Sequence, residues 1–369
     1  MKFILTCACL LLLSLNSFAV DQFNTLRWNR GNYNLQNNKT DQNNWFEWWY
    51  YKVVVPETGE SFFFMYGVVN PWDHSQKSIA SRSYIEMGDF SKKLQIKETY
   101  SVSKFNASYE NTLVDLPGGT ATDTNFQGKV ANTEGVVSSW NIAIENKWKF
   151  NATGWVTGRM LTNIEWHAAQ PDATCNGIIN SGGREIVLKD APCYQDRNWG
   201  NSFPKWWTWI VSNHFEKHPD TALALGGGNP TFLKRFKFLK GVAIGLKHKG
   251  KVYEFRPNDL DKVKVDVNFG KWNIIGINLE NKIEIVASAP KDKFMDLQFM
   301  TPSGEIFHDF ETLTGKVVVK LYKKQFVLSK RWKLLETLTS NFSGIEYGSR
   351  SRNITSNIFN SSINLFSNY

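Results

Sequence analysis

Cysteine is scarce in this chain, which has four cysteines among 369 residues. Cys7 and Cys9 lie in a hydrophobic N-terminal segment, so only Cys175 and Cys193 remain for the rest of the chain. Two cysteines and six scattered histidines have no recognisable metal-ligand spacing, and the sequence therefore predicts no metal site. In an oxidising compartment, cysteines 18 positions apart around a glycine-rich segment are expected to form a disulfide, worth about 3 kcal/mol of stability.

Long hydrophobic runs are absent after the N-terminus. Residues 1–19 begin with the positive charge of Lys2, continue with an apolar stretch from Phe3 to Leu15, and end in the small-x-small triplet Ser17-Phe18-Ala19. This order is typical of a secretory signal peptide, and the apolar stretch is too short for a membrane-spanning helix. We therefore expect an exported protein, periplasmic or secreted, whose mature chain begins at Val20. A retained N-terminal anchor is the alternative.

Common catalytic and cofactor motifs are also missing. The chain has no Gly-x-Ser-x-Gly, no His-Glu-x-x-His and no Rossmann glycine pattern. The run Gly226-Gly227-Gly228-Asn229-Pro230 lacks the Lys-Ser/Thr pair of a phosphate-binding loop, and we interpret it as a flexible turn. No cofactor is expected.

Positive charge exceeds negative charge, with a formal net charge of +9, but the basic residues are scattered. Clusters such as Lys234-Arg235 and Lys323-Lys324 are short, and no nucleic-acid motif accompanies them. We therefore expect no nucleic-acid partner. A solvated basic surface is the simpler interpretation, and weak peripheral contact with anionic membranes is the alternative.

Convincing amphipathic helices are missing, whereas short alternating segments bounded by turn residues recur along the whole chain. The pattern predicts an all-β protein with two β domains that meet near residues 170–195, where glycine and proline interrupt the alternation. The expected divisions are a signal peptide (1–19), a loose polar lead-in (20–43), an N-terminal β domain (44–185), a C-terminal β domain (186–348) and an Asn/Ser-rich tail (349–369).

Aromatic residues are abundant, with 15 tryptophans, and the densest stretch runs from Tyr194 to Trp209. It contains a Trp-Gly-Asn turn and then a strand with aromatic side chains on both faces. Period-2 spacing places Trp207 and Trp209 on one face and Trp206 on the other. Such a strand can line a cavity for a large apolar ligand.

This stretch, Tyr-x-x-x-Asn-Trp-Gly-x-x-Phe-Pro-x-x-Trp-x-Trp, resembles the central motif of the tocopherol cyclase-like family. The segment Trp45-Phe46-Glu47-Trp48-Trp49-Tyr50-Tyr51-Lys52 is similar to the family's opening motif, except that Trp48 stands where the family usually has glycine. Gly270-Lys271-Trp272 and the region from Glu311 to Gly348 follow in the family's order. The resemblance implies two lipocalin-like antiparallel β-barrel or sandwich domains packed in tandem.

The resemblance also implies an isomerase that cyclises a prenylated hydroquinone, or a related isoprenoid, to a chromanol-type ring by acid catalysis. A general acid protonates an alkene of the substrate, and the phenolic oxygen then closes the ring, with no metal or redox cofactor. Glu47 fits the acid because its aromatic neighbours reduce solvation of its charged form. The alternative is a structural glutamate paired with Lys52 or Arg197.

Further site residues are expected around these motifs. Asp196 is a second candidate acid, unless it caps a turn or pairs with Arg197, and His214 or His167 could accept the phenol proton, unless they are structural hydrogen-bond partners. Predicted substrate-binding residues are Trp49, Tyr50, Tyr194, Asn198, Trp199, Trp207 and Trp209. We expect Glu47 and the Asn198-Trp199-Gly200 turn to share one aromatic pocket.

Two other functions fit the same residues. A lipocalin-like barrel can carry an isoprenoid or lipid without reacting with it, since fold does not fix function. A glycan-binding module is the third hypothesis, because exposed tryptophans stack on sugars. Enclosed tryptophans favour an apolar ligand, and solvent-exposed tryptophans favour a glycan.

Overall fold

The computed structural model is all β within the residues that it describes, which are 22–28, 44–231, 241–326 and 329–351. The expected signal peptide and most of the expected tail lie outside these residues. Among the described residues, no helix is long and apolar enough to cross a membrane. The helical elements are three-residue 3-10 turns: η2 (Val102–Lys104), η3 (Gly154–Val156), η4 (Pro257–Asp259) and η5 (Lys291–Lys293).

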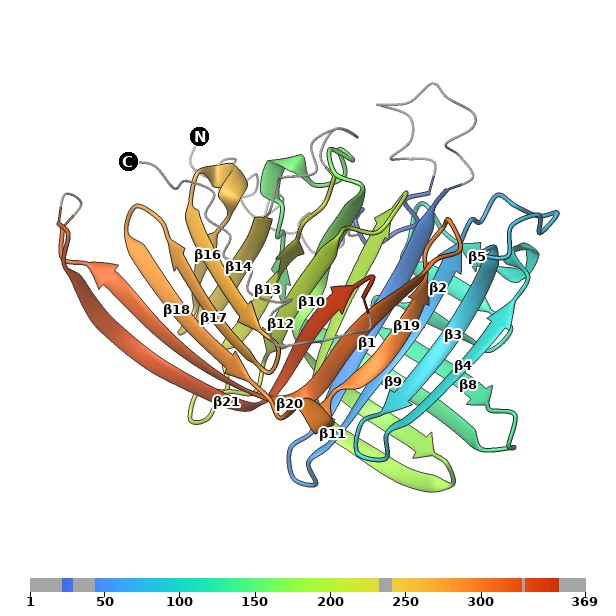
Figure 1. The fold of residues 1–369 in the computed structure, drawn as a ribbon. Helices are drawn as coiled ribbons and strands as arrows, with labels where there is room; N and C mark the ends of the chain where they lie inside the picture. Colours follow the sequence, from blue (N-terminus) through green and yellow to red (C-terminus); the bar gives the residue numbers. More distant parts are fainter. Residues whose placement is uncertain (1–21, 29–43, 232–240, 327–328, 352–369) are drawn as a thin grey trace, which may run out of the picture.

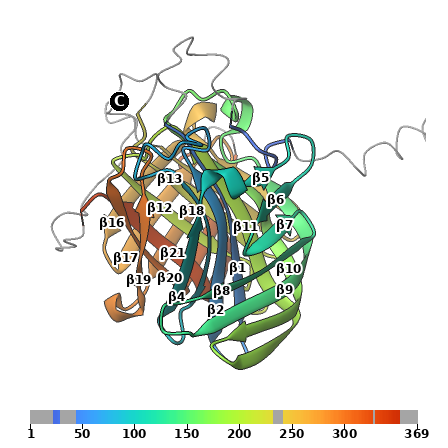
Figure 2. The same cartoon turned by 90° about the vertical axis from the view of Figure 1, so that its right-hand side faces the viewer.

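The first half of the chain forms an eleven-stranded antiparallel sheet in the order β4-β3-β2-β1-β11-β10-β9-β8-β7-β6-β5. This sheet curves round until β4 lies against β8 (Figures 1 and 2). Its strands are β1 (Phe46–Val55), β2 (Glu60–Val69), β3 (Arg82–Asp89), β4 (Leu94–Tyr100), β5 (Asn106–Ala107), β6 (Leu113–Leu116), β7 (Gly119–Thr122), β8 (Asn125–Ala131), β9 (Val137–Phe150), β10 (Ile164–Ser181) and β11 (Arg184–Gly200).

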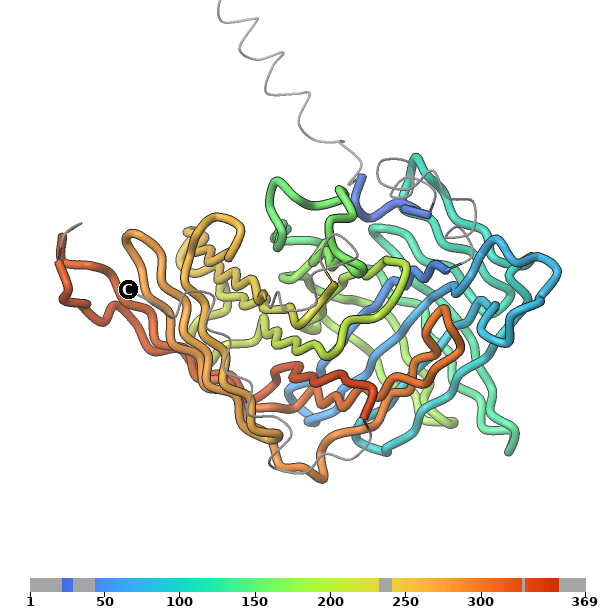
Figure 3. The backbone as a smooth tube through the Cα atoms, turned by 45° about the horizontal axis from the view of Figure 1, so that its top comes forward, coloured from blue at the N-terminus to red at the C-terminus, as the bar shows by residue number. Residues whose placement is uncertain are grey.

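The second half forms a ten-stranded antiparallel sheet in the order β15-β14-β13-β12-β21-β20-β18-β17-β16, and β19 pairs with β20 off this path. Its strands are β12 (Trp206–Ser212), β13 (Ala222–Gly228), β14 (Gly241–His248), β15 (Lys251–Phe255), β16 (Lys262–Asn268), β17 (Lys271–Ile277), β18 (Asn281–Ser288), β19 (Met295–Met300), β20 (Ile306–Lys324) and β21 (Trp332–Ser349). The two halves lie side by side (Figure 3).

Strand periodicity divides the apolar side chains into three layers. The first core fills the first sheet and contains Trp49 and Tyr51 of β1, and the second core fills the second sheet and contains Trp206 of β12. A middle layer lies between the sheets and contains residues of both, including Trp48 and Trp209. Because successive side chains of a strand point to opposite faces, β1 and β12 each serve a core and the middle layer at once.

The structure confirms two β units but places the change between them later than the sequence indicated. The boundary expected between residues 185 and 186 falls inside β11, and the chain changes sheets at residues 201–205. The glycines and proline in this region do not form a linker. They lie within the long β10–β11 hairpin, where they coincide with irregularities in the strand pairing. Gly182 and Gly183 take positive φ in its turn, and β10 shifts register between Cys175 and Gly177.

Two further expectations are corrected. Part of the lead-in is packed, because Leu26 belongs to the first core and the Asn24 carbonyl accepts a hydrogen bond from Trp49 Nε1 at 3.0 Å. The glycines of the expected flexible turn are the end of strand β13, where a Cβ on Gly226 would lie 2.9 Å from the ring of Trp166. Glycine is needed there because the tryptophan ring packs directly on the backbone.

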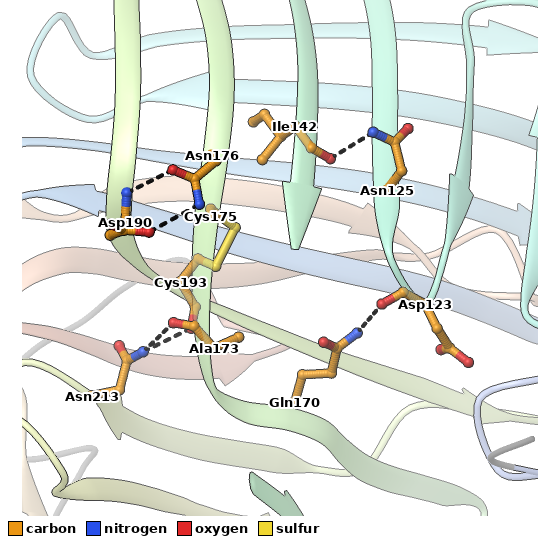
Figure 4. Close-up of a disulfide and its surroundings, with 10 residues drawn as sticks. All are labelled: Asp123, Asn125, Ile142, Gln170, Ala173, Cys175, Asn176, Asp190, Cys193 and Asn213. Carbon is orange, nitrogen blue, oxygen red and sulfur yellow. Dashed lines mark hydrogen bonds between the residues drawn. A yellow bond between two sulfur atoms is a disulfide. The ribbon is translucent and has the colours of Figure 1, made fainter. Parts of the chain in front are cut away.

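The predicted disulfide is confirmed. Cys175 of β10 and Cys193 of β11 are bonded, and their Cα atoms lie 5.8 Å apart. Asn213, which follows β12, donates hydrogen bonds to the backbone carbonyls of Ala173 and Cys193 at 3.0 and 2.8 Å (Figure 4). The second sheet is therefore anchored to the disulfide-bonded hairpin of the first.

Candidate active site

A cavity of about 310 Å³ lies in the middle layer, between the two sheets. Its aromatic walls come from both halves of the chain: Trp48 and Tyr50 of β1, Trp166 of β10, Trp207 and Trp209 of β12, and Phe299 of β19. This volume is at the lower end of the range for small-molecule sites. Trp207 and Trp209 share the cavity face, as period-2 spacing predicts.

Four acidic residues project into this aromatic cavity. Asp196 comes from β11, Asp309 and Glu311 come from β20, and Glu346 comes from β21. Asp196, Asp309 and Glu311 are almost fully buried, and Glu346 keeps part of its surface open. Acidic residues are rarely buried without cationic partners, so this concentration makes the cavity the candidate functional site.

Asp309 and Glu346 form a pair of carboxyl groups that interact through their side chains. Trp207 Nε1 donates to both residues, at 3.2 Å to Asp309 Oδ1 and also to Glu346 Oε1. Burial, together with the charge of Glu346, raises the pKa of Asp309 well above its ordinary value. Burial raises the pKa of Glu346 to about 7. Burial and the nearness of the two carboxyls disfavour two negative charges at once, so the pair retains a proton at neutral pH.

Glu311 lies beside this pair and accepts a hydrogen bond from the hydroxyl of Tyr50. Burial and the neighbouring Glu346 raise the pKa of Glu311 well above its ordinary value. The buried Lys52 opposes this shift through its positive charge, and burial in turn lowers the pKa of Lys52 to about 8.

Asp196 has a different environment. Its Oδ2 atom accepts hydrogen bonds from Trp166 Nε1 and from the Tyr194 hydroxyl, each at 2.7 Å. Burial raises the pKa of Asp196 to about 7, and these hydrogen bonds oppose the rise by stabilising the charged form. Tyr194 also accepts a hydrogen bond from Trp209 Nε1 at 3.1 Å, so it positions Asp196 from behind the cavity wall.

Asp309, Glu311 and Glu346 could also hold a cation, because one ligand atom of each lies within 4.8 Å of the others. No metal-ligand spacing in the sequence indicates this group. Asp309 and Glu311 lie two positions apart on β20, whereas Glu346 follows 35 positions after Glu311 and reaches them through the pairing of β20 with β21.

A fifth carboxyl, Glu165, lies at another edge of the cavity. Its oxygens accept hydrogen bonds at 2.5 Å from the backbone N–H groups of Gly158 and Met160. Burial raises the pKa of Glu165 to about 7, although these hydrogen bonds favour its ionised form. Glu165 therefore orders the 158–160 loop beside the cavity.

The pocket expected to unite Glu47 with the Asn198-Trp199-Gly200 turn does not form. Glu47 is paired in register with Trp199, but both side chains point away from the cavity, whereas Asn198 lines it. Glu47 is fully buried and forms an ion pair with Arg197, and its pKa is raised by burial against the effect of that charge. The structural alternative, pairing with Arg197, is therefore what the structure shows.

Arg197 explains the position of two other predicted binding residues. Its guanidinium carbon lies 4.5 Å from the ring centroid of Trp49 and 4.8 Å from that of Trp199. These tryptophans hold the buried arginine by cation–π contact on the face of the first sheet opposite the cavity. Asp196 does not pair with Arg197, because adjacent residues of β11 point to opposite faces.

Neither predicted histidine lines the cavity. His214 follows β12 and packs on the ring of Phe342 at 5.6 Å, and burial lowers its pKa. His167 of β10 is buried and packs at 5.6 Å from the ring of Phe23. The structure thus brings together Tyr50, Asp196, Asn198, Trp207 and Trp209, with Tyr194 behind Asp196, and leaves Glu47, Trp49, Trp199 and His214 elsewhere.

Sequence reasoning missed the three acids of the second sheet. The available signal was local: Asp309 and Glu311 alternate with aromatic residues in Phe307-His308-Asp309-Phe310-Glu311, so both carboxyls share one face of an otherwise apolar strand. Glu346 lies between Gly344 and Gly348, and nothing near it in the sequence indicates its partners.

The protein is all β, and its two lipocalin-like sheets border an acid-lined aromatic cavity. The family model described as tocopherol cyclase-like matches residues 43–118 and 79–349. The chain belongs to the tocopherol cyclase-like family, as its motifs indicated.

Relatives of known name are distant. The chain is 24% identical over 357 residues to the chloroplastic tocopherol cyclase of Zea mays, covering 82% of this chain and 74% of that protein. It is 25% identical over 355 residues to the probable chloroplastic tocopherol cyclase of Oryza sativa subsp. japonica, with 82% and 75% coverage. The crystal structure of CghA matches with a TM-score of 0.50 and 10% identity over 83% of this chain and 88% of that one, which shows a shared fold.

Proposed function

We propose that this protein is an acid-catalysed cyclase that closes a chromanol-type ring on a prenylated hydroquinone or a related isoprenoid. The observation that carries this proposal is the group of buried carboxyls with raised pKa inside an aromatic cavity. Membership of the family, whose named relatives are tocopherol cyclases, supports the same reaction. The reaction is an isomerisation, so it consumes no oxidant or reductant.

The Asp309–Glu346 pair donates the proton in this proposal. Its acidic hydrogen is held on Asp309 because the neighbouring carboxyls and burial disfavour a second negative charge there. Transfer to the nearest substrate alkene breaks the O–H bond of Asp309 and forms a C–H bond, leaving a tertiary carbocation. The resulting carboxylate lies beside the cation and stabilises it electrostatically.

Asp196 accepts the proton that the phenol loses as its oxygen bonds to the cation. Its two hydrogen-bond donors stabilise the charged form, so the ionised carboxylate is held ready to receive the proton. Return of this proton to the Asp309–Glu346 pair restores the starting state. The π faces of Trp207, Trp209 and Tyr50 stabilise the cation, and the aromatic side chains limit the access of water that would trap it.

The decisive test is product analysis after incubation with prenylated 1,4-hydroquinones. Conversion to a product of identical mass that has lost one alkene and one phenol supports the cyclase. Asp309→Asn and Glu346→Gln should each reduce kcat by about 100-fold or more, because neither amide donates a proton at neutral pH. Both variants should bind the substrate within a few-fold of the wild type, because the cavity shape is kept.

Glu284→Gln is the matched control. Glu284 of β18 accepts a hydrogen bond from the hydroxyl of Tyr322 at 2.7 Å, just as Glu311 accepts one from Tyr50. Glu284 is not among the residues that line the cavity. This variant should retain full activity. Saturable binding of every hydroquinone without conversion would instead identify a carrier, and unchanged activity of Asp309→Asn would remove that residue from the mechanism.

We also propose that the protein is exported, since the disulfide between Cys175 and Cys193 is typical of an oxidising compartment. The signal-like segment itself lies outside the described residues. N-terminal sequencing of protein recovered from cell fractions tests this, and a soluble intracellular protein that retains residues 1–19 would contradict it.

A further inference from the structure

A second cavity of about 360 Å³ lies next to the acid-lined one, and among the residues lining the two only Trp48 and Phe299 are common to both. We propose that the two cavities are halves of one channel and that the Trp48–Phe299 ring stack closes it, thereby limiting the length of the isoprenoid chain that the site accepts. The proposal rests on the proposed substrate class, a prenylated hydroquinone or related isoprenoid, but it does not require that the protein convert this substrate.

The second cavity is formed where the β19–β20 hairpin meets the first sheet. One wall comes from β3 and β4, with Arg82 and Lys97, and the opposite wall is β19, with Gln298 and Met300. Lys97 Nζ donates to the Gln298 carbonyl at 2.9 Å, which fixes this edge of the hairpin against the sheet. The charged groups lie on these walls, and Val69 and Phe203 are buried side chains of the lining that can contact an apolar chain.

The partition between the cavities is built from packed rings. Trp48 and Phe299 are stacked, with centroids 5.1 Å apart and ring planes at 27°. Phe46 stacks on Trp48 at 4.8 Å, and Phe203 packs edge-on against it at 5.5 Å. Trp48 Nε1 also donates to Asn198 Oδ1 at 3.1 Å, so the indole is fixed by a hydrogen bond as well as by packing.

The partition stands close to the proposed acid. Trp207, which donates to Asp309 and Glu346, has its ring centroid 6.2 Å from that of Phe299 and 6.3 Å from that of Trp48. When the alkene of a substrate reaches the acid pair beside Trp207, the rings of Trp48 and Phe299 are therefore its next neighbours. An isoprenoid chain directed that way can continue only if the rings separate or one of them is removed.

The sequence supports the same role for Trp48. It occupies the position at which the motif that this chain resembles has glycine, and a glycine there has no side chain to stack on Phe299. Replacing Trp48 by a small residue would join the cavities and roughly double the space, because the second cavity is slightly larger than the first. Trp48 is therefore a specificity-determining residue of the site.

The test measures binding of 1,4-hydroquinones that carry one, two, three or four isoprene units, by calorimetry, to the full-length protein. Wild-type protein should bind the shorter chains best. Trp48→Ala and Phe299→Ala should each move the optimum to longer chains, changing the affinity ratio of longest to shortest by about tenfold or more, because newly accommodated methylene groups become buried.

Trp48→Phe is the matched control. It loses the hydrogen bond to Asn198, as Trp48→Ala does, but keeps an aromatic ring against Phe299, so it should retain the wild-type chain-length preference. If Trp48→Ala weakens binding of all four ligands by one common factor, Trp48 only positions its neighbours and the proposal is overturned. Circular dichroism melting of each variant confirms that the comparison is between folded proteins.

The outcome also separates this proposal from the proposed reaction. A shift in binding preference without any ring closure would support the channel and contradict the cyclase. Ring closure with an unchanged preference in both alanine variants would support the cyclase and contradict the channel.

Discussion

At the scale of single residues, neighbouring side chains of one strand take opposite roles. Arg197 points to the first core, where Glu47 neutralises it and two tryptophans enclose it, whereas Asp196 points into the cavity. A buried arginine requires a counter-charge, whereas burial without a counter-charge raises the pKa of a carboxyl. The same strand therefore holds a structural ion pair on one face and a cavity carboxyl with a raised pKa on the other.

The ion pair leads to the first prediction. Glu47→Gln should lower the free energy of unfolding by about 3 kcal/mol or more, because it leaves the buried guanidinium of Arg197 without its counter-charge. Chemical denaturation measures this loss. The folded fraction should still cyclise substrate, and Glu47→Asp, which keeps the charge, should be closer to the wild type in stability. Normal stability combined with lost activity would instead assign Glu47 to the chemistry.

At the scale of elements, the β10–β11 hairpin connects the parts of the molecule. It pairs with β1 and β9 inside the first sheet, carries the disulfide, and supplies Glu165 and Asp196 to the cavity. Asn213 anchors the start of the second sheet to it. The hairpin therefore sets the position of the second sheet relative to the first.

This arrangement predicts the effect of removing the disulfide. Cys175→Ser with Cys193→Ser should lower the free energy of unfolding by about 3 kcal/mol, since the closed loop of 18 positions restricts the unfolded chain. Both cysteines are fully buried, so the serine hydroxyls add to the loss, and the alanine pair serves as the control for this effect. Ligand binding at low temperature should be kept, because the cavity lies on the other face of the hairpin. Equal melting temperatures with and without a reductant would contradict this prediction.

At the scale of the whole molecule, the site exists only where the two sheets meet. Neither half alone holds both the acid pair, which comes from β20 and β21, and Asp196, which comes from β11. The carboxyls lose solvation because one sheet covers the other, and this burial is the largest cause of each raised pKa. The raised pKa values are thus a property of the assembled layers.

The raised pKa values predict how stability depends on pH. Between the ordinary pKa of an aspartate, 3.8, and the value of about 7 for Asp196, the folded protein binds more protons than the unfolded chain. The stabilisation is complete below the ordinary pKa and is lost as pH rises through 7. Unfolding free energy, measured by denaturant titration, should therefore fall by about 1 kcal/mol or more from pH 5 to pH 8.

Asp196→Asn gives the matched comparison, because the amide keeps the shape but does not titrate. Its stability should depend less steeply on pH over the same range than that of the wild type. Activity of the wild type should also decline above pH 7, as the cavity carboxyls ionise. Parallel stability curves for the two proteins would show that Asp196 titrates normally.

The sequence by itself determined the all-β class, the family, the disulfide and the aromatic face of β12. These follow from local rules: two-residue periodicity, a long motif of fixed spacing, and a small number of cysteines. It also identified Tyr50, Asp196, Asn198, Trp207 and Trp209, because cavity residues on β1, β11 and β12 lie inside the motifs themselves.

Only the tertiary structure decided which acids lie together in the cavity. Period-2 alternation predicts that Glu47 and Trp48 face opposite ways, but it does not predict which of them faces the other sheet. The structure places Trp48 at the cavity and Glu47 on the opposite face of the first sheet, paired with Arg197. Asp309, Glu311 and Glu346 are brought to Asp196 by packing across more than 100 positions of sequence. Their pKa values depend on burial by distant strands, and burial of this kind is fixed when the sheets pack and is not encoded in any local pattern.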